Sequence, residues 1–216
     1  MAGNVIGAVL AGGRGRRIGG DKPSLELGDR TLVRRVVAAL RSAQLEVALV
    51  LRPGQPVPLT AHTIAVVRDE IENAGPMGGL QALLRWLPVE WALVTACDQP
   101  FLAPRLLRGL LRERKDGFQA ICTRPGGLRE PLPGLYHRSV LPAIDRALER
   151  GERSLGDLLP SLRLREVPRH VVEQWDPSLA SFLNINTPTE LERARALIAS
   201  QSKPSQRAAS APLTRR

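Results

Sequence analysis

A glycine-rich segment follows the first apolar run of the chain and carries several cations. Residues 10–22 read Leu-Ala-Gly-Gly-Arg-Gly-Arg-Arg-Ile-Gly-Gly-Asp-Lys. Its basic side chains are Arg14, Arg16, Arg17 and Lys22. Five glycines within residues 12–20 let backbone N–H groups approach an anion closely. A surface loop with solvated arginines is the alternative, but a position directly after a buried strand favours phosphate binding.

This segment differs from two common phosphate-binding motifs. A GxGxxG fingerprint beginning at Gly13 would need its third glycine where Ile18 stands. The P-loop needs a lysine directly after a glycine, whereas Asp21 precedes Lys22. The sequence therefore excludes an ordinary dinucleotide-binding fold and a P-loop NTPase.

Two aspartates follow apolar runs and could work beside a phosphate site. Asp98 comes shortly after the run 91–96, and Asp69 comes shortly after the run 64–67. Mg²⁺ prefers oxygen ligands and commonly takes one or two carboxylates plus substrate phosphates. A turn or cap role is the alternative for Asp98, and a solvated loop acid is equally compatible with Asp69. Beside the glycine-rich segment, we favour Asp98 as a magnesium ligand.

The composition limits the classes of protein to which the chain can belong. It has 216 residues, 43% of them hydrophobic and 3% aromatic, and a formal net charge of +10. Low aromatic content argues against a base-stacking platform, and the dispersed charge argues against a nucleic-acid partner. Apolar runs stay far below the roughly 20 residues that span a bilayer, and Cys97 and Cys122 form no disulfide framework. We expect a soluble, cytoplasmic protein. Its positive charge also suits an enzyme with polyanionic substrates, and composition alone does not decide between such an enzyme and a nucleic-acid binder.

Strands and helices alternate in the apolar pattern. We predict strands at 4–10, 47–51, 64–67, 91–96, 118–123, 132–136 and 162–167. We predict helices at 31–43, 77–87, 104–114, 139–150 and 188–199. This alternation predicts a three-layer α/β/α fold with a mostly parallel, mixed sheet. We expect one domain over residues 1–200 and a disordered basic tail over 201–216.

The predicted sheet directs attention to one of its edges. In such folds ligands bind at the carboxyl ends of the strands. We therefore expect the site among the segments that follow Leu10, Val67, Ala96 and Tyr136.

Four motifs together resemble one family. Residues 10–22 resemble the signature L-A-G-G-x-x-x-R-[MI]-G-x-D-K, and residues 97–102 resemble C-D-x-P-x-[LI]. Residues 75–79 resemble G-P-L-[AG]-G, and residues 184–191 resemble N-I-N-T-P-x-[DE]-L. These are motifs of the molybdenum cofactor guanylyltransferases (MobA family), within the MobA-like NTP transferase group. The resemblance covers nearly the whole chain.

This resemblance implies a Rossmann-like nucleotidyltransferase fold and a set of roles. The implied nucleotide-binding residues are Leu10, Ala11, Gly12, Gly13, Lys22, Asp69, Gly78 and Asp98. The implied catalytic residues are Arg17, Lys22 and Asp98, with Asp98 holding Mg²⁺. The implied reaction joins GMP from GTP to the terminal phosphate of molybdenum-bearing molybdopterin. Molybdoenzymes or other cofactor-biosynthesis proteins are the further partners that it suggests.

Two asparagines are the candidates for contact with the pterin. Asn184 and Asn186 flank Ile185, so they point the same way if the segment is extended. Their amides can donate to and accept from a pterin. From the residues alone, bracing of the turn before the next helix is the favoured alternative. The resemblance shifts our expectation to contact with the pterin.

One departure from the family leaves the base preference open. Some relatives have an asparagine after the second strand that contacts the nucleotide, whereas here residues 50–54 contain Arg52 instead. Transfer of CMP, or of another nucleotide to a related phosphorylated acceptor, is therefore the nearest alternative. A catalytically idle nucleotide-binding partner of a molybdoenzyme assembly is a second alternative, and a nucleic-acid module is a third.

Overall fold

The computed structural model describes residues 5–13, 18, 21–58 and 64–201. Arg14, Arg16 and Arg17 therefore lie outside the described residues, as does the predicted tail from residue 202 onward. Within the described ranges, no helix combines the length and apolarity needed to cross a lipid bilayer.

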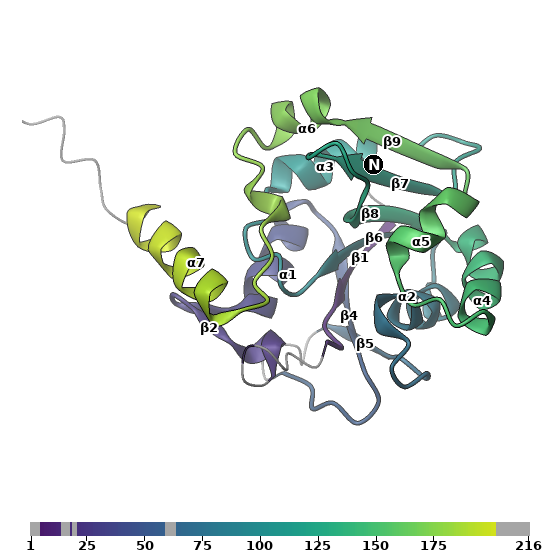
Figure 1. The fold of residues 1–216 in the computed structure, drawn as a ribbon, viewed down its shortest axis with the longest axis horizontal. Coiled ribbons are helices and arrows are strands. Elements are labelled where there is room, and N and C mark those ends of the chain that lie inside the picture. The colour runs from purple at the N-terminus through teal and green to yellow at the C-terminus, as the bar shows by residue number, and fades with distance from the viewer. Residues whose placement is uncertain (1–4, 14–17, 19–20, 59–63, 202–216) are drawn as a thin grey trace, which may run out of the picture.

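A seven-stranded mixed sheet forms the centre of the molecule (Figure 1). Its order is β5-β4-β1-β6-β8-β7-β9. The strands are β1 (Val5–Leu10), β4 (Glu46–Leu51), β5 (Ala65–Arg68), β6 (Trp91–Ala96), β7 (Ala120–Arg124), β8 (Glu130–His137) and β9 (Leu164–Pro168). Neighbouring strands are parallel except that β8 runs antiparallel to both β6 and β7. The predicted mostly parallel, mixed sheet is confirmed.

Helices cover both faces of this sheet, which confirms the predicted three layers (Figure 1). On one face lie α1 (Leu32–Ser42), α3 (Pro104–Arg112) and α6 (Arg169–Trp175). On the other lie α2 (Gly75–Trp86), α4 (Leu141–Glu149) and α5 (Leu155–Leu158). Along β1, Val5 and Val9 pack into the first core, and Ile6 and Ala8 pack into the second. Since both faces are buried, the strands read as continuous apolar runs.

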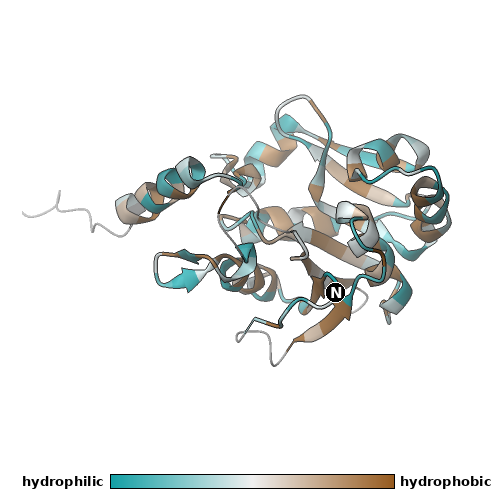
Figure 2. Ribbon diagram, turned by 60° about the horizontal axis from the view of Figure 1, so that its bottom comes forward, coloured by the Kyte–Doolittle hydropathy of each residue, from teal (hydrophilic) through white to brown (hydrophobic). Residues whose placement is uncertain are grey.

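A smaller hydrophobic cluster lies beside the sheet. The hairpin of β2 (Glu26–Leu27) and β3 (Arg30–Thr31) packs against α7 (Pro188–Gln201). Leu27, Leu32, Ile185, Leu191 and Ala194 form this cluster. Figure 2 shows hydrophobic residues concentrated in the central sheet, with α7 more mixed. We call this unit the side cluster, because it packs separately from the two main cores.

Most predicted elements occur near their predicted positions. The strand at 91–96 matches β6, and the predicted helix 139–150 divides into a 3-10 turn and α4. Sequence reasoning missed the β2–β3 hairpin, α5 and α6, which are too short to show a clear period. The 3-10 turns are Lys22–Ser24, Arg138–Val140, Leu159–Ser161 and Ala180–Phe182.

One expectation about the functional edge is wrong. The prediction places the segment after Tyr136 at the same edge as Leu10 and Ala96, but β8 runs the opposite way and pairs His137 with Trp91 at the start of β6. The segment after Tyr136 therefore lies at the opposite edge of the sheet. An apolar strand looks the same in sequence whichever way it is inserted, so the pattern could not reveal this reversal.

Candidate functional site

A pocket of about 410 Å³ opens where β1, β4, β5 and β6 end. Its lining includes Leu10, Gly12, Gly13, Lys22, Asp69 and Asp98. These residues come from four separate segments, and the parallel strands bring them to one edge. The edge is the one at which ligands bind in open α/β sheets. Most of the predicted nucleotide-binding residues therefore line a single cavity.

The start of the glycine-rich segment continues β1 past the end of the strand. The N–H of Ala11 donates to the carbonyl of Val50 at 2.9 Å, and the carbonyl of Leu10 accepts from the N–H of Cys97 at 3.1 Å. A Cβ on Gly12 would lie 3.1 Å from the backbone nitrogen of Arg52, whereas a Cβ on Gly13 would meet nothing within 4 Å. Gly12 therefore permits close packing of two loops, and Gly13 faces open space.

The structure separates two predicted residues from the pocket lining. Ala11 is fully buried, its N–H is bonded to Val50, and it lies behind the pocket. Gly78 is also buried and is not part of the lining, and Gly79 lines the pocket instead. A Cβ on Gly78 would lie 2.8 Å from Oδ2 of Asp69, so glycine at this position lets α2 approach that carboxylate.

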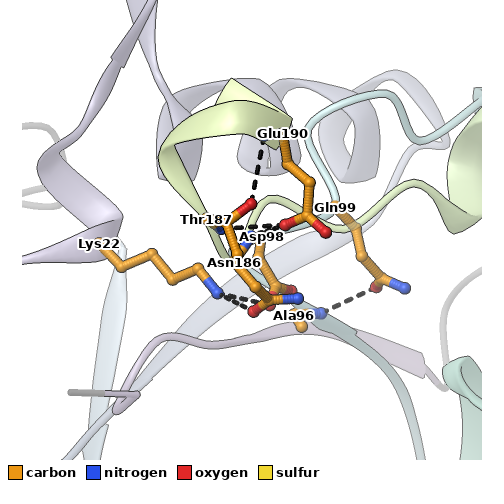
Figure 3. Close-up of polar contacts among 7 residues, drawn as sticks. All are labelled: Lys22, Ala96, Asp98, Gln99, Asn186, Thr187 and Glu190. Atoms are coloured by element: carbon orange, nitrogen blue, oxygen red, sulfur yellow. Dashed lines mark hydrogen bonds and ion pairs between the residues drawn. The ribbon is translucent and has the colours of Figure 1, made fainter. Parts of the chain in front are cut away.

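Lys22 joins three distant segments at the centre of the site (Figure 3). Its Nζ lies 2.7 Å from Oδ2 of Asp98 and 2.6 Å from Oδ1 of Asn186. Lys22 is buried, with 7% of its surface exposed, and these two acceptors offset the cost of burying its ammonium group. Lys22 is a predicted nucleotide-binding residue, Asp98 is the predicted metal ligand and Asn186 is a predicted pterin contact. The structure brings these three side chains together at Nζ of Lys22.

Asp98 is held at the end of β6 by its neighbours in sequence. Oε1 of buried Gln99 accepts from the N–H of Ala96 at 3.1 Å (Figure 3). Nε2 of Gln99 donates to the carbonyl of Leu132 at 2.9 Å. The carbonyl of Asp98 accepts from the N–H of Ile185 at 3.0 Å. These bonds hold the backbone around Asp98 and join it to the asparagine segment, and Lys22 holds the carboxylate itself.

The thiol beside Asp98 is unsuited to nucleophilic chemistry. Cys97 is buried, and desolvation raises the pKa of its thiol to about 12. The thiolate form, which is the reactive one, is therefore suppressed at neutral pH. Cys97 packs within the first main core, as expected for a small core residue.

Asp69 occupies the corresponding position after β5. Its N–H donates to the carbonyl of Leu51 at 2.8 Å, and its Oδ1 accepts from the N–H of Ile71 at 2.9 Å. Burial raises the pKa of the Asp69 carboxyl above its usual value, against the opposing effect of the Ile71 hydrogen bond. The carboxylate lines the pocket next to the first turn of α2, where Gly78 lies.

The asparagine segment has the expected alternation. Asn184 and Asn186 are exposed, and Ile185 between them is buried in the side cluster. Asn186 is brought to Lys22, whereas Asn184 has no polar contact among those of the described residues. The two amides therefore share one side of the segment, and one of them reaches the centre of the site.

A capping box fixes Asn186 at the start of α7 (Figure 3). Oε2 of Glu190 accepts from the N–H groups of Asn186 and Thr187 at 2.6 and 2.9 Å, and the N–H of Glu190 donates to Oγ1 of Thr187 at 3.2 Å. Thr187 is therefore the N-cap residue of α7. The hydrogen bond from the Asn186 backbone holds the pKa of Glu190 below its usual value.

Two residues that are not among the predicted site residues lie at or directly behind the pocket. Arg52 lines the pocket, and its Nε is buried with no hydrogen-bond partner in the described part of the chain. Gln55 lies directly behind the glycine-rich segment with 1% of its surface exposed. The difference from the family at residue 52 is the sequence feature that pointed to Arg52. No feature of the sequence pointed to Gln55.

The donor set allows a test of whether a metal ion fits. Asp98 is the carboxylate that faces Lys22, and no three histidine, cysteine or acidic side chains gather into a metal-binding group among the described residues. Such a site does not suit Zn²⁺, which takes three or four protein ligands. It suits Mg²⁺, which commonly combines one or two carboxylates with substrate phosphates and water.

Known proteins resemble this chain over most of its length. The MobA-like NTP transferase domain model matches residues 7–167. A probable molybdenum cofactor guanylyltransferase of Pelotomaculum thermopropionicum is 32% identical over 191 residues, covering 88% of this chain and 92% of that protein. The molybdenum cofactor guanylyltransferase of Desulfosudis oleivorans is 31% identical, covering 90% and 96%. The crystal structure of molybdopterin-guanine dinucleotide biosynthesis protein A from Archaeoglobus fulgidus is 29% identical with a TM-score of 0.79, covering 90% and 98%.

Proposed function

Because the chain belongs to the MobA-like NTP transferase family and is a nucleotidyltransferase, we propose that it transfers GMP from GTP to molybdopterin. The acceptor is the terminal phosphate of the molybdenum-bearing pterin, and the products are pyrophosphate and a guanine dinucleotide cofactor. The proposal depends on one observation above all. A single pocket joins the glycine segment, Lys22 and Asp98, and Asn186 reaches it from another part of the chain.

The reaction needs positioning and charge stabilisation rather than a nucleophile from the protein. An oxygen of the pterin phosphate forms a bond to the α-phosphorus of GTP, and the bond from this phosphorus to the bridging oxygen of the β-phosphate breaks. A phosphate monoester is largely ionised at neutral pH, since its second pKa is about 6. No general base is required. His137, a residue that can act as a base in other enzymes, lies at the opposite edge of the sheet.

The roles of the protein groups follow from their places in the pocket. Gly12 and Gly13 line the pocket, and their backbone N–H groups would contact the phosphates. The ammonium group of Lys22 would offset the negative charge that grows on the leaving pyrophosphate. Asp69 borders the nucleotide pocket next to Gly79. Arg17 adds a second cation by resemblance to the family, and its place lies outside the described residues.

Asp98 is the residue that would hold Mg²⁺. When bound, Mg²⁺ supplies Lewis-acid charge that polarises the phosphoryl oxygens. The oxygen of Asp98 that contacts Lys22 shows that this carboxylate already faces the cationic centre of the pocket. Lys22 and Asp98 thus have complementary proposed roles, since Lys22 would bind anionic oxygens and Asp98 would bind a cation.

The acceptor enters from the side of Asn184 and Asn186. Both side chains are exposed and their segment packs against the end of β6 through the bond from Ile185 to Asp98. Amides there can pair with the donors and acceptors of a pterin ring. This arrangement would place the pterin phosphate next to Lys22 and the α-phosphorus of the nucleotide.

Product identity is the direct test. The purified chain is incubated with Mg²⁺, molybdopterin and each of GTP, CTP, ATP and UTP, and the products are identified by mass spectrometry. We expect the GMP adduct and pyrophosphate with GTP. Preference for CTP would overturn the choice of base, and GTP binding without pyrophosphate release would indicate an idle binding partner. Nucleotide-independent and strongly salt-dependent binding to DNA or RNA would indicate a nucleic-acid module.

A further inference from the structure

Gln55 is a buried polar residue behind the pocket that the proposed reaction does not use. It follows β4 in a turn and has 1% of its surface exposed. A buried amide is costly unless its donors and acceptor are satisfied, so its partners indicate why it is there.

The amide of Gln55 joins the two ends of the glycine-rich segment. Its Nε2 donates to the carbonyl of Ala11 at 3.1 Å and to Oδ1 of Asp21 at 3.2 Å. Ala11 directly precedes Gly12, and Asp21 directly precedes Lys22. An NH₂ group has two hydrogens, and here one goes to each end of the segment.

The other groups of Gln55 and Asp21 are also engaged. Oε1 of Gln55 accepts from the N–H of Arg52 at 3.3 Å. Oδ2 of Asp21 accepts from Oγ of Ser24 at 2.6 Å, which fixes Asp21 to the 3-10 turn that begins at Lys22. A hydrophobic side chain of the same size could fill the volume at residue 55 but could make none of these bonds.

The turn that carries Gln55 is itself fixed to the sheet. The N–H of Gln55 donates to the carbonyl of Arg52 at 3.3 Å, and Gly54 supplies the positive φ of +67° in this turn. Nη1 of Arg68, the last residue of β5, donates to the carbonyls of Arg52 and Gln55 at 3.3 and 2.9 Å. Gln55 therefore connects the glycine-rich segment to two strands of the sheet.

We propose that Gln55 is a positioning residue for phosphate binding. It holds the backbone that leads into Gly12 and Gly13 against the turn that carries Lys22, so that both contact the same phosphate chain. This inference rests on the proposed function, because it assigns a support to the same pocket. It predicts that loss of the Gln55 amide weakens phosphate binding and spares recognition of the nucleoside.

The test compares Gln55→Met with Gln81→Met in the full chain. Gln81 is a matched control because it is also buried and its amide binds Asp145, away from the pocket. Isothermal titration with Mg²⁺ measures the affinity for inorganic tripolyphosphate and, separately, for guanosine. We expect Gln55→Met to weaken tripolyphosphate binding about ten-fold and guanosine binding less than about two-fold. Gln81→Met should leave both affinities unchanged even where it lowers the melting temperature.

A second pair of variants covers the case in which Gln55→Met does not fold. Asp21 is exposed, and Asp21→Ala removes an acceptor of the Gln55 amide, whereas Asp21→Asn keeps one and removes the same charge. Asp21→Ala should bind tripolyphosphate about three-fold more weakly than Asp21→Asn. Equal affinity in this pair, or equal loss of tripolyphosphate and guanosine binding in Gln55→Met, would overturn the inference.

The tripolyphosphate measurements are independent of the base and of the acceptor. A chain that binds tripolyphosphate through Gln55 but makes no GMP adduct would contradict the proposed function and support the inference. If the chain makes the adduct and Gln55→Met binds tripolyphosphate as the wild type does, the proposed function is supported and the inference about Gln55 is contradicted.

Discussion

The nucleotide side and the acceptor side of the site are built differently. On the nucleotide side, Leu10 ends β1, and Asp69 and Asp98 follow β5 and β6 in the parallel part of the sheet. The N–H of Asp69 donates to the last residue of β4, and the carbonyl of Leu10 accepts from the N–H of the residue after the end of β6. On the acceptor side, Asn184 and Asn186 are exposed residues of a segment that packs on the side cluster. The first region depends on the main cores, and the second depends on one capping box and a few contacts. The acceptor side should therefore be the easier one to alter without loss of the fold.

Asp98→Asn should have the largest effect on activity, because it removes the charge that the nucleotide side contributes to metal binding. We expect a loss of turnover of about 10²-fold to 10³-fold, of the order seen when an electrostatic catalytic group is removed. Pyrophosphate release measures it, and circular dichroism should show an intact fold. Near-normal turnover would remove Asp98 as the metal ligand.

Asn186→Ala tests the residue at which the two regions meet. The side chain of Asn186 contacts Lys22 on the nucleotide side, whereas its proposed role is to bind the pterin. We expect the KM for molybdopterin to rise about ten-fold and the dissociation constant for GTP to change only a few-fold. Equal losses for both substrates would mean that the segment only braces Lys22.

Glu190→Ala tests whether the capping box positions the acceptor side. We expect a few-fold rise in the KM for molybdopterin, with kcat and GTP affinity nearly unchanged, since Asn186 loses its backbone anchor.

Glu190 also gives this region a defined pH dependence. Because its folded pKa lies below the unfolded value of 4.5, the carboxylate stabilises the fold above that value. This contribution is lost as the pH falls through the folded pKa. Melting temperatures of the wild type and Glu190→Ala should therefore converge as the pH is lowered below about 4.5. A difference that does not change with pH would contradict the charged capping box.

Deletion of residues 201–216 should have the smallest effect. This segment contains four basic residues and no acidic ones, and none of the predicted site residues belongs to it. We expect unchanged kcat and KM for GTP and molybdopterin in the turnover assay. A clear loss of activity would mean that the tail takes part in substrate binding.

Sequence patterns located the nucleotide side better than its supports. The apolar runs and the motifs beside them placed Leu10, Lys22 and Asp98 correctly at one pocket, because chain order and strand ends determine these positions. They could not predict that Gly79 lines the pocket and Gly78 does not, because this depends on how α2 is rotated against Asp69. They also missed Gln55, whose partners lie 44 and 34 residues away and leave no local pattern.

The two acceptors of Lys22 affect the entropy of ligand binding. A lysine side chain loses about 1.5–2 kcal/mol of rotamer freedom when it is immobilised. Since Asp98 and Asn186 already hold Nζ in the free protein, this loss accompanies folding. A phosphate that reaches the pocket exchanges one partner of a stationary ammonium group for another, and it does not have to order a mobile chain.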